Sequence, residues 1–452
     1  MLDAETAAIP FSTGPAAGLR RQLGLGSAAA AVAGEAIGVG IFLTPAAMAK
    51  SLGSPFWLLV VWLAMGAMTM SGALCYGELA GRFPRPGGSY VYLQETFGPR
   101  TAFLYGWMCL LVLDPGLTAA LAAGAAGYAA YIFHWSPAGI KLAALSCIWL
   151  LCLLNVFSTR ISAGFLRSIT WLKFGVLGLL PVWAIGFHRG DWSNFLPFVP
   201  QRAGSLPLAP ALGAAMVAAF FSFGGWWDVT KIAGEVRDPA RTVPRALAMG
   251  VLSVTAAYVV ISAVFVYLVP LNRVTSDETF VAQAGEVLFG PAGGVVLAGI
   301  VIVCVLGSMA ALIMSAPRVY FAMARDGLFL PAVARISPRF GTPALAVAIL
   351  GLVSSLLAVL GTFQQIIAYF VFIAVVFLGL TVAGLFLLRA RREAPGLALL
   401  TPGYPFTPVV FLVMVALLLA LLMMHSPREA LLGCVVVLAG LPVHSAFERR
   451  RS

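Results

Sequence analysis

The chain has 452 residues, of which 61% are hydrophobic and only 10% are charged, against about 25% charged in an ordinary soluble domain. This composition, with a mean hydropathy of +0.98 and repeated apolar runs, excludes a soluble globular protein and predicts a bundle of membrane-spanning helices. The formal net charge of +11 would indicate nucleic acid in a soluble chain. Here the Lys and Arg residues flank apolar segments and indicate membrane topology, so we expect no nucleic-acid partner.

The apolar runs predict an all-α integral membrane protein of about twelve transmembrane helices in a single domain, residues 27–446. The expected spans, in chain order, are 27–49, 56–81, 101–132, 141–158, 163–187, 210–233, 246–270, 292–324, 343–360, 364–388, 405–424 and 429–446. Residues 1–26 do not resemble a signal peptide, so we expect a cytoplasmic tail there and a second one at 447–452.

The distribution of basic residues predicts the orientation. With the N-terminus inside, most of the 28 Lys and Arg fall on the cytoplasmic side, and Lys173 lies within a span. Those that fall outside are Lys50, Lys141, Arg189, Arg202, Arg273 and Arg428. This asymmetry follows the positive-inside rule and predicts that both termini are cytoplasmic.

Two of the expected spans contain glycines near their middles, at Gly34 to Gly40 (GEAIGVG) and at Phe221 to Trp226 (FSFGGW). Because five spans separate these positions, the two helices cross in opposite directions, as in an inverted repeat of five plus five helices. The repeats would cover about 27–187 and 210–388, with extra helices at about 405–446. Close packing of small residues is the plainer explanation of such glycines. Their matched positions favour broken helices whose free backbone groups line a cavity.

At these residues the chain resembles the amino acid–polyamine–organocation transporter superfamily, in the branch of the L-type amino-acid transporters. Gly34 to Pro45 (GEAIGVGIFLTP) is similar to the family's G-x-x-x-G-x-G-I-F signature, and Phe221 to Asp228 (FSFGGWWD) resembles its sixth helix. Tyr76 to Tyr92 (YGELAGRFPRPGGSYVY) and Ala316 to Pro331 (APRVYFAMARDGLFLP) resemble two cytoplasmic elements. The resemblance implies a LeuT-like fold with helices 1 and 6 broken and two extra C-terminal helices.

The resemblance also implies a substrate site at the two breaks. In the family, backbone amides at the first break hold the substrate's carboxylate, which agrees with the positive dipole end of a half-helix N-terminus. Backbone carbonyls near both breaks hold the α-ammonium, and Phe221 corresponds to the aromatic gate. Val39 stands where many relatives have a small hydroxyl residue, so only its backbone contact carries over. The candidate substrate-binding residues are Ile37, Gly38, Val39, Gly40, Phe221, Phe223 and Gly224.

Lys173, in the fifth span, is the clearest charged residue within the membrane, where an ionisable group costs roughly 2.5 to 3.5 kcal/mol on insertion. Snorkelling to the cytoplasmic interface would have to cross about ten residues. By resemblance, its ammonium occupies the place where sodium-coupled proteins of this fold bind Na⁺, so we expect no sodium coupling. A lysine at this depth can also titrate.

Three carboxylates complete the candidate coupling residues. Glu35, beside the first break, can attract a cationic substrate, carry a proton, or accept hydrogen bonds from freed backbone N–H groups. Asp114 precedes a proline and can satisfy backbone opened by a kink. Asp228 is three residues before Lys231, so an intrahelical ion pair is available.

Two acids lie at the expected cytoplasmic ends of spans. For Glu78 in the second span and Glu235 after the sixth, we expect ion pairs with arginines such as Arg82 or Arg318. Such pairs would form an inner gate and would not contact the substrate.

These observations predict a secondary active transporter of amino acids that works by alternating access. Neutral L-amino acids, moved by H⁺ symport or amino-acid exchange, are favoured by the apolar surroundings of the breaks. The alternative is a cationic amino acid or polyamine held by Glu35. We expect no enzyme, because the histidines lie near the membrane edges and no GxSxG or P-loop motif occurs. A channel would need a continuous polar pore.

No cofactor or metal is expected. The six cysteines lack CxxC spacing and are expected to be core residues. The expected partners are a small-molecule amino acid, H⁺ and the lipid bilayer, and the expected protein is a monomer or a weak oligomer. The expected location is a cell membrane, in particular a bacterial inner membrane.

Overall fold

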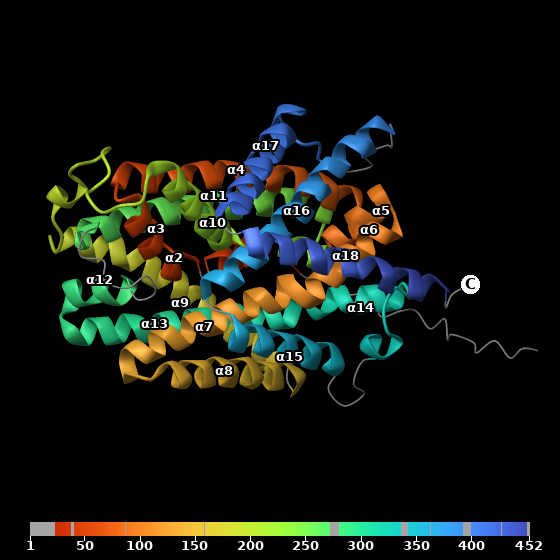
Figure 1. Ribbon diagram of the computed structural model, residues 1–452, viewed down its shortest axis with the longest axis horizontal. Coiled ribbons are helices and arrows are strands. Elements are labelled where there is room, and N and C mark those ends of the chain that lie inside the picture. The colour runs from red at the N-terminus through yellow and green to blue at the C-terminus, as the bar shows by residue number, and fades with distance from the viewer. Residues whose placement is uncertain are drawn as a thin grey trace, which may run out of the picture.

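The computed structural model describes residues 23–37, 40–85, 87–157, 159–271, 280–335, 342–361, 363–391, 399–425 and 427–449. Over these residues the regular structure is helical, apart from one isolated β-bridge between Leu23 and Val236. Most of the long helices run roughly along the long axis of the molecule (Figure 1).

In chain order the α-helices are α1 (Leu25–Ala36), α2 (Gly40–Leu43), α3 (Pro45–Leu52), α4 (Pro55–Arg82), α5 (Ser89–Phe97), α6 (Pro99–Met108), α7 (Asp114–Phe133), α8 (Pro137–Phe157), α9 (Thr159–Gly186), α10 (Leu208–Phe223), α11 (Pro239–Leu268), α12 (Phe280–Phe289), α13 (Pro291–Ser315), α14 (Pro317–Arg325), α15 (Ala344–Leu360), α16 (Phe363–Ala390), α17 (Phe406–His425) and α18 (Pro427–Arg449). A π-helical segment, η1 (Cys109–Leu113), joins α6 to α7. The 3₁₀ segments are η2 (Trp192–Phe195), η3 (Asp228–Glu235) and η5 (Pro331–Ala334).

Ten of the described helical segments are long and apolar enough to cross a membrane, and two shorter apolar ones are Leu172–Gly186 and Ala344–Leu360. Each expected span coincides with one of these segments, although the boundaries differ by several residues in places. The prediction of an all-helical membrane protein is confirmed, because uninterrupted apolar runs of this length have few other solutions.

Two short helices were not expected from the sequence. α5 begins directly after Gly88 and ends directly before Gly98, and both glycines have positive φ. α12 lies between α11 and α13 and packs mainly against α13. Each has ten residues or fewer, so a search for apolar runs long enough to span a membrane passes over them.

The two interrupted helices pack against longer ones, α1 against α11 and α10 against α4 and α17. α11 packs along α4 and along α1, while α13 packs along α7 and against α9. α10 packs against α3 and α4. The breaks of the first and sixth spans are therefore held inside the bundle and not on its surface.

The two C-terminal helices bury little of their own surface: α17 packs against α16, α4 and α10, and α18 packs against α16 and α6. Only 28% and 22% of their most apolar stretches are buried.

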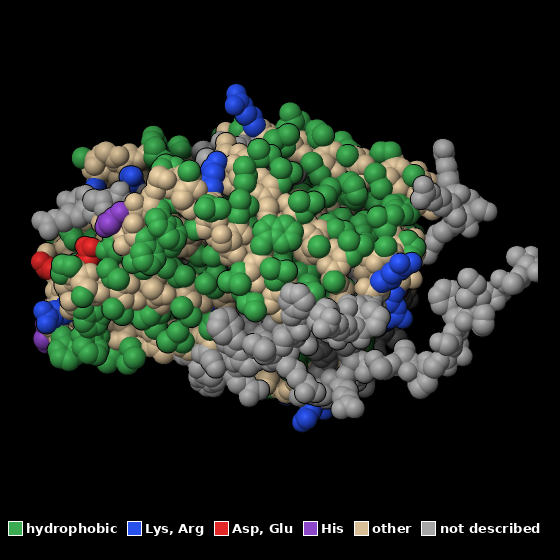
Figure 2. Space-filling view, turned by 90° about the horizontal axis from the view of Figure 1, so that it is seen from below, with side chains coloured by type: hydrophobic (Ala, Val, Ile, Leu, Met, Phe, Trp, Pro, Cys, Tyr) green, Lys and Arg blue, Asp and Glu red, His purple; other side chains and the backbone are tan. Residues whose placement is uncertain are grey.

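Cys434 is exposed on α18, so the expectation that all six cysteines are core residues is wrong for this one. A lipid-facing helix takes apolar residues outward, and apolar character alone does not distinguish core from lipid contact. Figure 2 shows a molecular face dominated by hydrophobic side chains.

Candidate functional site

The first span is interrupted where the sequence predicts. α1 ends at Ala36, and Ile37 caps it with its N–H 2.8 Å from the Ala33 carbonyl oxygen. α2 begins at Gly40, and the chain bends again at Thr44. Gly38 and Val39, two of the candidate substrate-binding residues, lie outside the described residues.

The sixth span is interrupted at its Gly pair. α10 ends at Phe223, the chain turns through Gly224 and Gly225, and η3 begins at Asp228. Gly225 has φ +94°, a conformation that L-residues with a side chain rarely adopt. A Cβ there would also lie 3.1 Å from Cγ of Glu35. Glycine is therefore needed both for the turn and for the approach of the first span.

The two breaks lie directly against each other. A Cβ on Gly40 would lie only 2.0 Å from Cα of Ser222, so α2 and α10 touch backbone to backbone. The Ser222 Oγ is 2.6 Å from the Thr44 Oγ1, which also donates to the Gly40 carbonyl at 2.9 Å. For Gly40, close packing is thus an observed role.

Tyr258 of α11 joins the two breaks. Its hydroxyl oxygen is 2.6 Å from the carbonyl oxygen of Ala36 and 2.6 Å from that of Ser222. Both carbonyls belong to the last helical turn before a break, and the residues four positions later, Gly40 and Trp226, lie beyond it. The hydroxyl therefore supplies a donor where the regular helical donor is displaced.

A small cavity of about 10 Å³ lies where the breaks meet. This is room for roughly one water molecule, so the space around the breaks is closed in this conformation. The side chains of its wall are apolar except for one carboxylate and one hydroxyl. The lining residues are Glu35, Ala36, Leu117, Leu121, Phe221, Gly224, Gly225, Ser308 and Leu312.

The candidate substrate-binding residues are placed differently around this cavity. Phe221 and Gly224 line it, and the Phe221 ring meets the Phe370 ring of α16 edge to face at 6.1 Å. Ile37 is buried at the end of α1. Phe223 lies in an aromatic cluster away from the cavity wall, with its ring 5.1 Å from that of Tyr258.

Lys173 of α9 is buried and bonded inside the bundle. Its ammonium donates to the Gly34 carbonyl oxygen at 3.3 Å and to the Ser308 Oγ at 2.5 Å. The side chain thus joins α9 to α1 and α13 and does not extend toward an interface. Ser308 also lines the cavity, so Lys173 is connected to the cavity wall through its hydrogen bond with Ser308.

Glu35 stands in the last turn of α1, with its side chain against Gly225 and in the cavity wall. Four other charged groups act on it electrostatically, namely Asp228, Lys231, Lys173 and Asp114. The position agrees with the expected one beside the first break.

Asp114 and Asp228 lie in one buried cluster around Lys231. The Lys231 ammonium is 2.9 Å from Asp228 Oδ1 and 3.6 Å from Asp114 Oδ1. The expected intrahelical pair of Asp228 with Lys231 is therefore present. The Tyr320 hydroxyl oxygen of α14 is 2.8 Å from Asp114 Oδ2 and 3.0 Å from the Cys109 carbonyl oxygen. Asp114 therefore joins α7 to η3 and α14, and it stands where the π-helical segment η1 gives way to α7.

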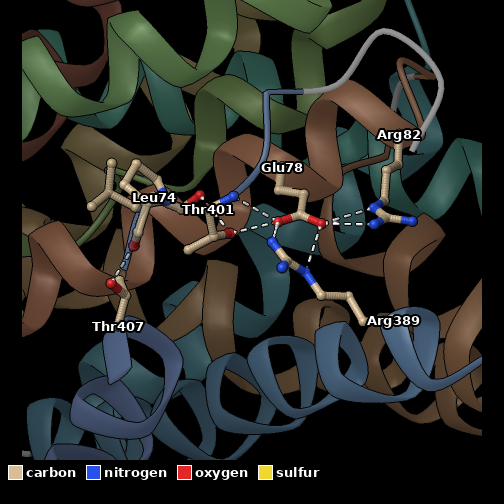
Figure 3. Close-up of polar contacts among 7 residues, drawn as sticks. Leu74, Glu78, Arg82, Arg389, Thr401 and Thr407 are labelled. Atoms are coloured by element: carbon tan, nitrogen blue, oxygen red, sulfur yellow. Dashed lines mark hydrogen bonds and ion pairs between the residues drawn. The ribbon is translucent and has the colours of Figure 1, made fainter. Parts of the chain in front are cut away.

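Glu78 forms a second buried cluster, shown in Figure 3. Arg82 donates to its Oε1 at 2.8 Å, Arg389 of α16 to Oε2 at 2.6 Å, and the Thr401 backbone N–H to Oε2 at 2.7 Å. The expected pair with Arg82 is confirmed. Arg389, which the sequence did not single out, is a second arginine partner of Glu78, and the Arg318 guanidinium donates to the Met314 carbonyl oxygen in its own span. The Glu235 side chain lies outside the described residues.

Sequence reasoning missed several residues of these clusters. Tyr258, Ser308 and Tyr320 are hydroxyl-bearing residues within long apolar spans. A buried hydroxyl needs a hydrogen-bond partner, so each is a signal of a polar contact in the bundle, although the sequence does not say with which helix. Among the described residues, no three His, Cys, Asp or Glu side chains are grouped as a metal site would require.

Comparison with known proteins covers nearly the whole chain. Residues 23–435 match a family described as "Amino acid permease". The chain is 29% identical over 441 residues to the serine/threonine exchanger SteT of Bacillus subtilis (strain 168), covering 96% of this chain and 98% of that protein. It is 28% identical over 436 residues to b(0,+)-type amino acid transporter 1 of Mus musculus, covering 95% and 88%. It is also 28% identical over 440 residues to large neutral amino acids transporter small subunit 2 of Homo sapiens, covering 96% and 81%.

Proposed function

Because this chain belongs to the amino acid permease family, we propose that it is a secondary transporter that moves amino acids across a membrane by alternating access. The family resemblance predicted from the sequence motifs is thereby confirmed. The observation that carries the proposal is the cavity enclosed by the two adjoining helix breaks, which provides backbone polar groups inside an apolar bundle.

The proposed architecture has twelve spans, the ten long segments together with the two shorter apolar ones. The first ten spans form the inverted repeat of five plus five, and α17 and α18 are the extra helices. Both termini lie in the cytoplasm, and a bacterial inner membrane is the proposed location. The breaks of α1–α2 and α10–η3 support the repeat, because they fall at matching places in the first and sixth spans.

The proposed substrate site uses both breaks. Backbone amides of Gly38, Val39 and Gly40 hold the carboxylate, and carbonyls near Ile37 and at the end of α10 hold the ammonium. Phe221 closes over the bound molecule. Substrate entry requires the cavity to enlarge from its closed form, by movement of the elements around the breaks. Lys173 takes the place of a sodium ion through its contacts with the Gly34 carbonyl and Ser308.

Neutral L-amino acids are the first proposed substrates. Leu117, Leu121 and Leu312 supply an apolar part of the cavity wall, and a neutral side chain loses no charge hydration against it. Transport would proceed by exchange or by H⁺ symport. Exchange is supported by the similarity of this chain to SteT, a serine/threonine exchanger.

Cationic amino acids or polyamines are the second candidate, and one observation favours them. The carboxylate of Glu35 lies in the cavity wall, where it can pair with a positively charged substrate group in a low-dielectric environment. The two candidates differ in what they require of this single side chain.

The test is uptake of radiolabelled L-amino acids into proteoliposomes of the purified full-length protein. A pH gradient, a Na⁺ gradient and trapped unlabelled amino acid are imposed separately. We expect uptake driven by the pH gradient or by trapped amino acid, and no stimulation by Na⁺. Saturation is required, because flux that rises linearly with concentration would indicate a channel.

Glu35→Gln distinguishes the two substrate classes. If Glu35 pairs with a substrate cation, uptake of cationic substrates is lost while neutral uptake persists. If the substrate is neutral, the variant retains its specificity. Asp191→Asn, at a fully exposed loop position, is the matched control for removing one carboxylate.

A further inference from the structure

Tyr320 has one hydroxyl proton and two close acceptors. Its oxygen is 3.0 Å from the Cys109 carbonyl oxygen and 2.8 Å from Asp114 Oδ2, and all three residues are buried. With Asp114 ionised, the single proton must be shared between two acceptors. With a proton on Oδ2, Asp114 donates to Tyr320 and Tyr320 donates to the Cys109 carbonyl, so each short contact contains its own proton.

Among the residues that the structure describes, the carboxylates around the cavity outnumber the cations by one. Three carboxylates lie there, Glu35, Asp114 and Asp228, with two ammonium groups, Lys173 and Lys231. Asp228 is the carboxylate that contacts Lys231 within hydrogen-bond distance, and Asp114 is 0.7 Å farther from the same ammonium (3.6 against 2.9 Å). An uncompensated buried charge is costly, and protonation removes it.

The ion pair that Asp114 makes among the described residues is the one with Lys231, and α14, which carries Tyr320, also carries Arg318, whose guanidinium donates to the Met314 carbonyl oxygen, and Arg325. Besides the groups already named, Cys109 and Tyr105 of the preceding segment are the titratable groups beside it. α13 and α15, which pack on α7, have no Asp, Glu, Lys, Arg or His. Of the other packed helices, α8 has Lys141, bonded to the Val359 carbonyl, and α16 has Arg389, bound to Glu78.

We propose that Asp114 is the proton-binding site of this transporter, and that Tyr320 positions the bound proton by accepting a hydrogen bond from Oδ2. The inference rests on the proposed transport function and specifies where a coupled proton is held. Binding forms an O–H bond on Oδ2, and release returns that proton to water.

The position of Asp114 explains how proton release would reach the substrate site. Once ionised, Asp114 attracts the Lys231 ammonium, 3.6 Å away on η3. η3 continues directly from the Gly224–Gly225 turn, and Leu117, three residues after Asp114, lines the same cavity. Ionisation of Asp114 therefore draws η3 toward α7 beside the cavity. Proton binding and the conformation of the sixth-span break are linked through one ion pair.

Infrared difference spectroscopy of the purified full-length protein tests the site without requiring transport. We expect a band of a buried protonated carboxyl group that is lost as the pH is raised. The band should be missing in Asp114→Asn and present in Glu35→Gln. Its persistence in Asp114→Asn, or its absence from the wild type, would overturn the proposal while leaving the transport function untouched.

Transport with a pH-sensitive dye trapped in proteoliposomes tests the consequence. Substrate entry should acidify the lumen in the wild type and should no longer do so in Asp114→Asn, in which any residual exchange moves no proton. An unchanged proton flux in Asp114→Asn refutes the assignment.

Tyr320→Phe separates the proposed hydrogen-bond direction from its reverse. If Asp114 donates, removing the acceptor disfavours the protonated acid, and the pH of half-maximal uptake falls by about one unit. If Tyr320 instead donates to an ionised Asp114, that pH rises, which contradicts the proposal. Tyr131→Phe is the matched control, because it removes a phenol that contacts Glu286 at the other end of α7.

Discussion

Removal of the Tyr258 hydroxyl is expected to weaken the junction between the two helix breaks. The hydroxyl oxygen lies 2.6 Å from the carbonyl oxygens of both Ala36 and Ser222, so Tyr258→Phe deprives two buried acceptors of one donor. Hydrogen bonds within membrane proteins average about 0.6 kcal/mol, and a buried group left without a partner costs about 1–3 kcal/mol. We therefore expect the folded state to lose about 0.6 to 3 kcal/mol, with the upper part of this range applying if both carbonyls stay dry.

The assay combines thermal stability of the purified protein with concentration-dependent uptake in proteoliposomes. Tyr258→Phe should lower the melting temperature and raise the substrate concentration for half-maximal uptake, because the carbonyl positions at both breaks are no longer fixed. Tyr267→Phe is the control in the same helix, since it retains the backbone carbonyl that accepts from the Asp191 N–H at 2.9 Å. If the two variants are indistinguishable in stability and uptake, the hydroxyl does not hold the breaks together.

Three further substitutions test other parts of the site. Gly225→Ala should lower the free energy of unfolding by about 1–2 kcal/mol because its φ is positive, and it should reduce uptake. The control is Gly178→Ala, which should have little effect because an added Cβ meets nothing within 4 Å. Equal uptake by both variants would contradict the requirement for glycine at position 225. Glu78→Gln should destabilise the protein by about 3–5 kcal/mol, because it leaves buried arginine charge uncompensated, while Glu95→Gln, at a partly exposed ion pair, should change the melting temperature little. Lys173→Met should reduce uptake at least tenfold, which corresponds to a free-energy difference of about 1.4 kcal/mol, because the donor to Gly34 and Ser308 is lost. Wild-type uptake in this variant would exclude a role for the ammonium group.

The spans and the positions of their breaks could be predicted from the sequence because both depend on local chemistry. A run of apolar residues must form a helix in a membrane, whatever surrounds it. The pair Gly224–Gly225 likewise allows a turn by itself, since the residue at φ +94° meets no side-chain penalty. Glu35 and Lys173 could be identified as functional candidates because an ionisable residue inside a span needs a partner.

The partners themselves could not be predicted, because they depend on which helices meet. Asp114 and Tyr320 are separated by 206 residues, and Glu78 and Arg389 by 311. Arg318 and Arg389 look equivalent as cytoplasmic arginines in the sequence, and only the packing of α16 against α4 selects the second. Short helices such as α5 give too few residues for a hydrophobic pattern to be recognised.

The contact between Gly40 and Ser222 restricts how the closed cavity can open. Because α2 and α10 touch backbone to backbone and share the Thr44–Ser222 hydrogen bond, neither segment can tilt alone without a steric clash or the loss of that bond. They can be displaced only together, as one rigid body. The separation that admits a substrate must then occur along the border of that body. At this border Phe221, which lines the cavity, meets the Phe370 ring of α16 edge to face. Two rings can part there by side-chain rotation, and no backbone hydrogen bond has to break.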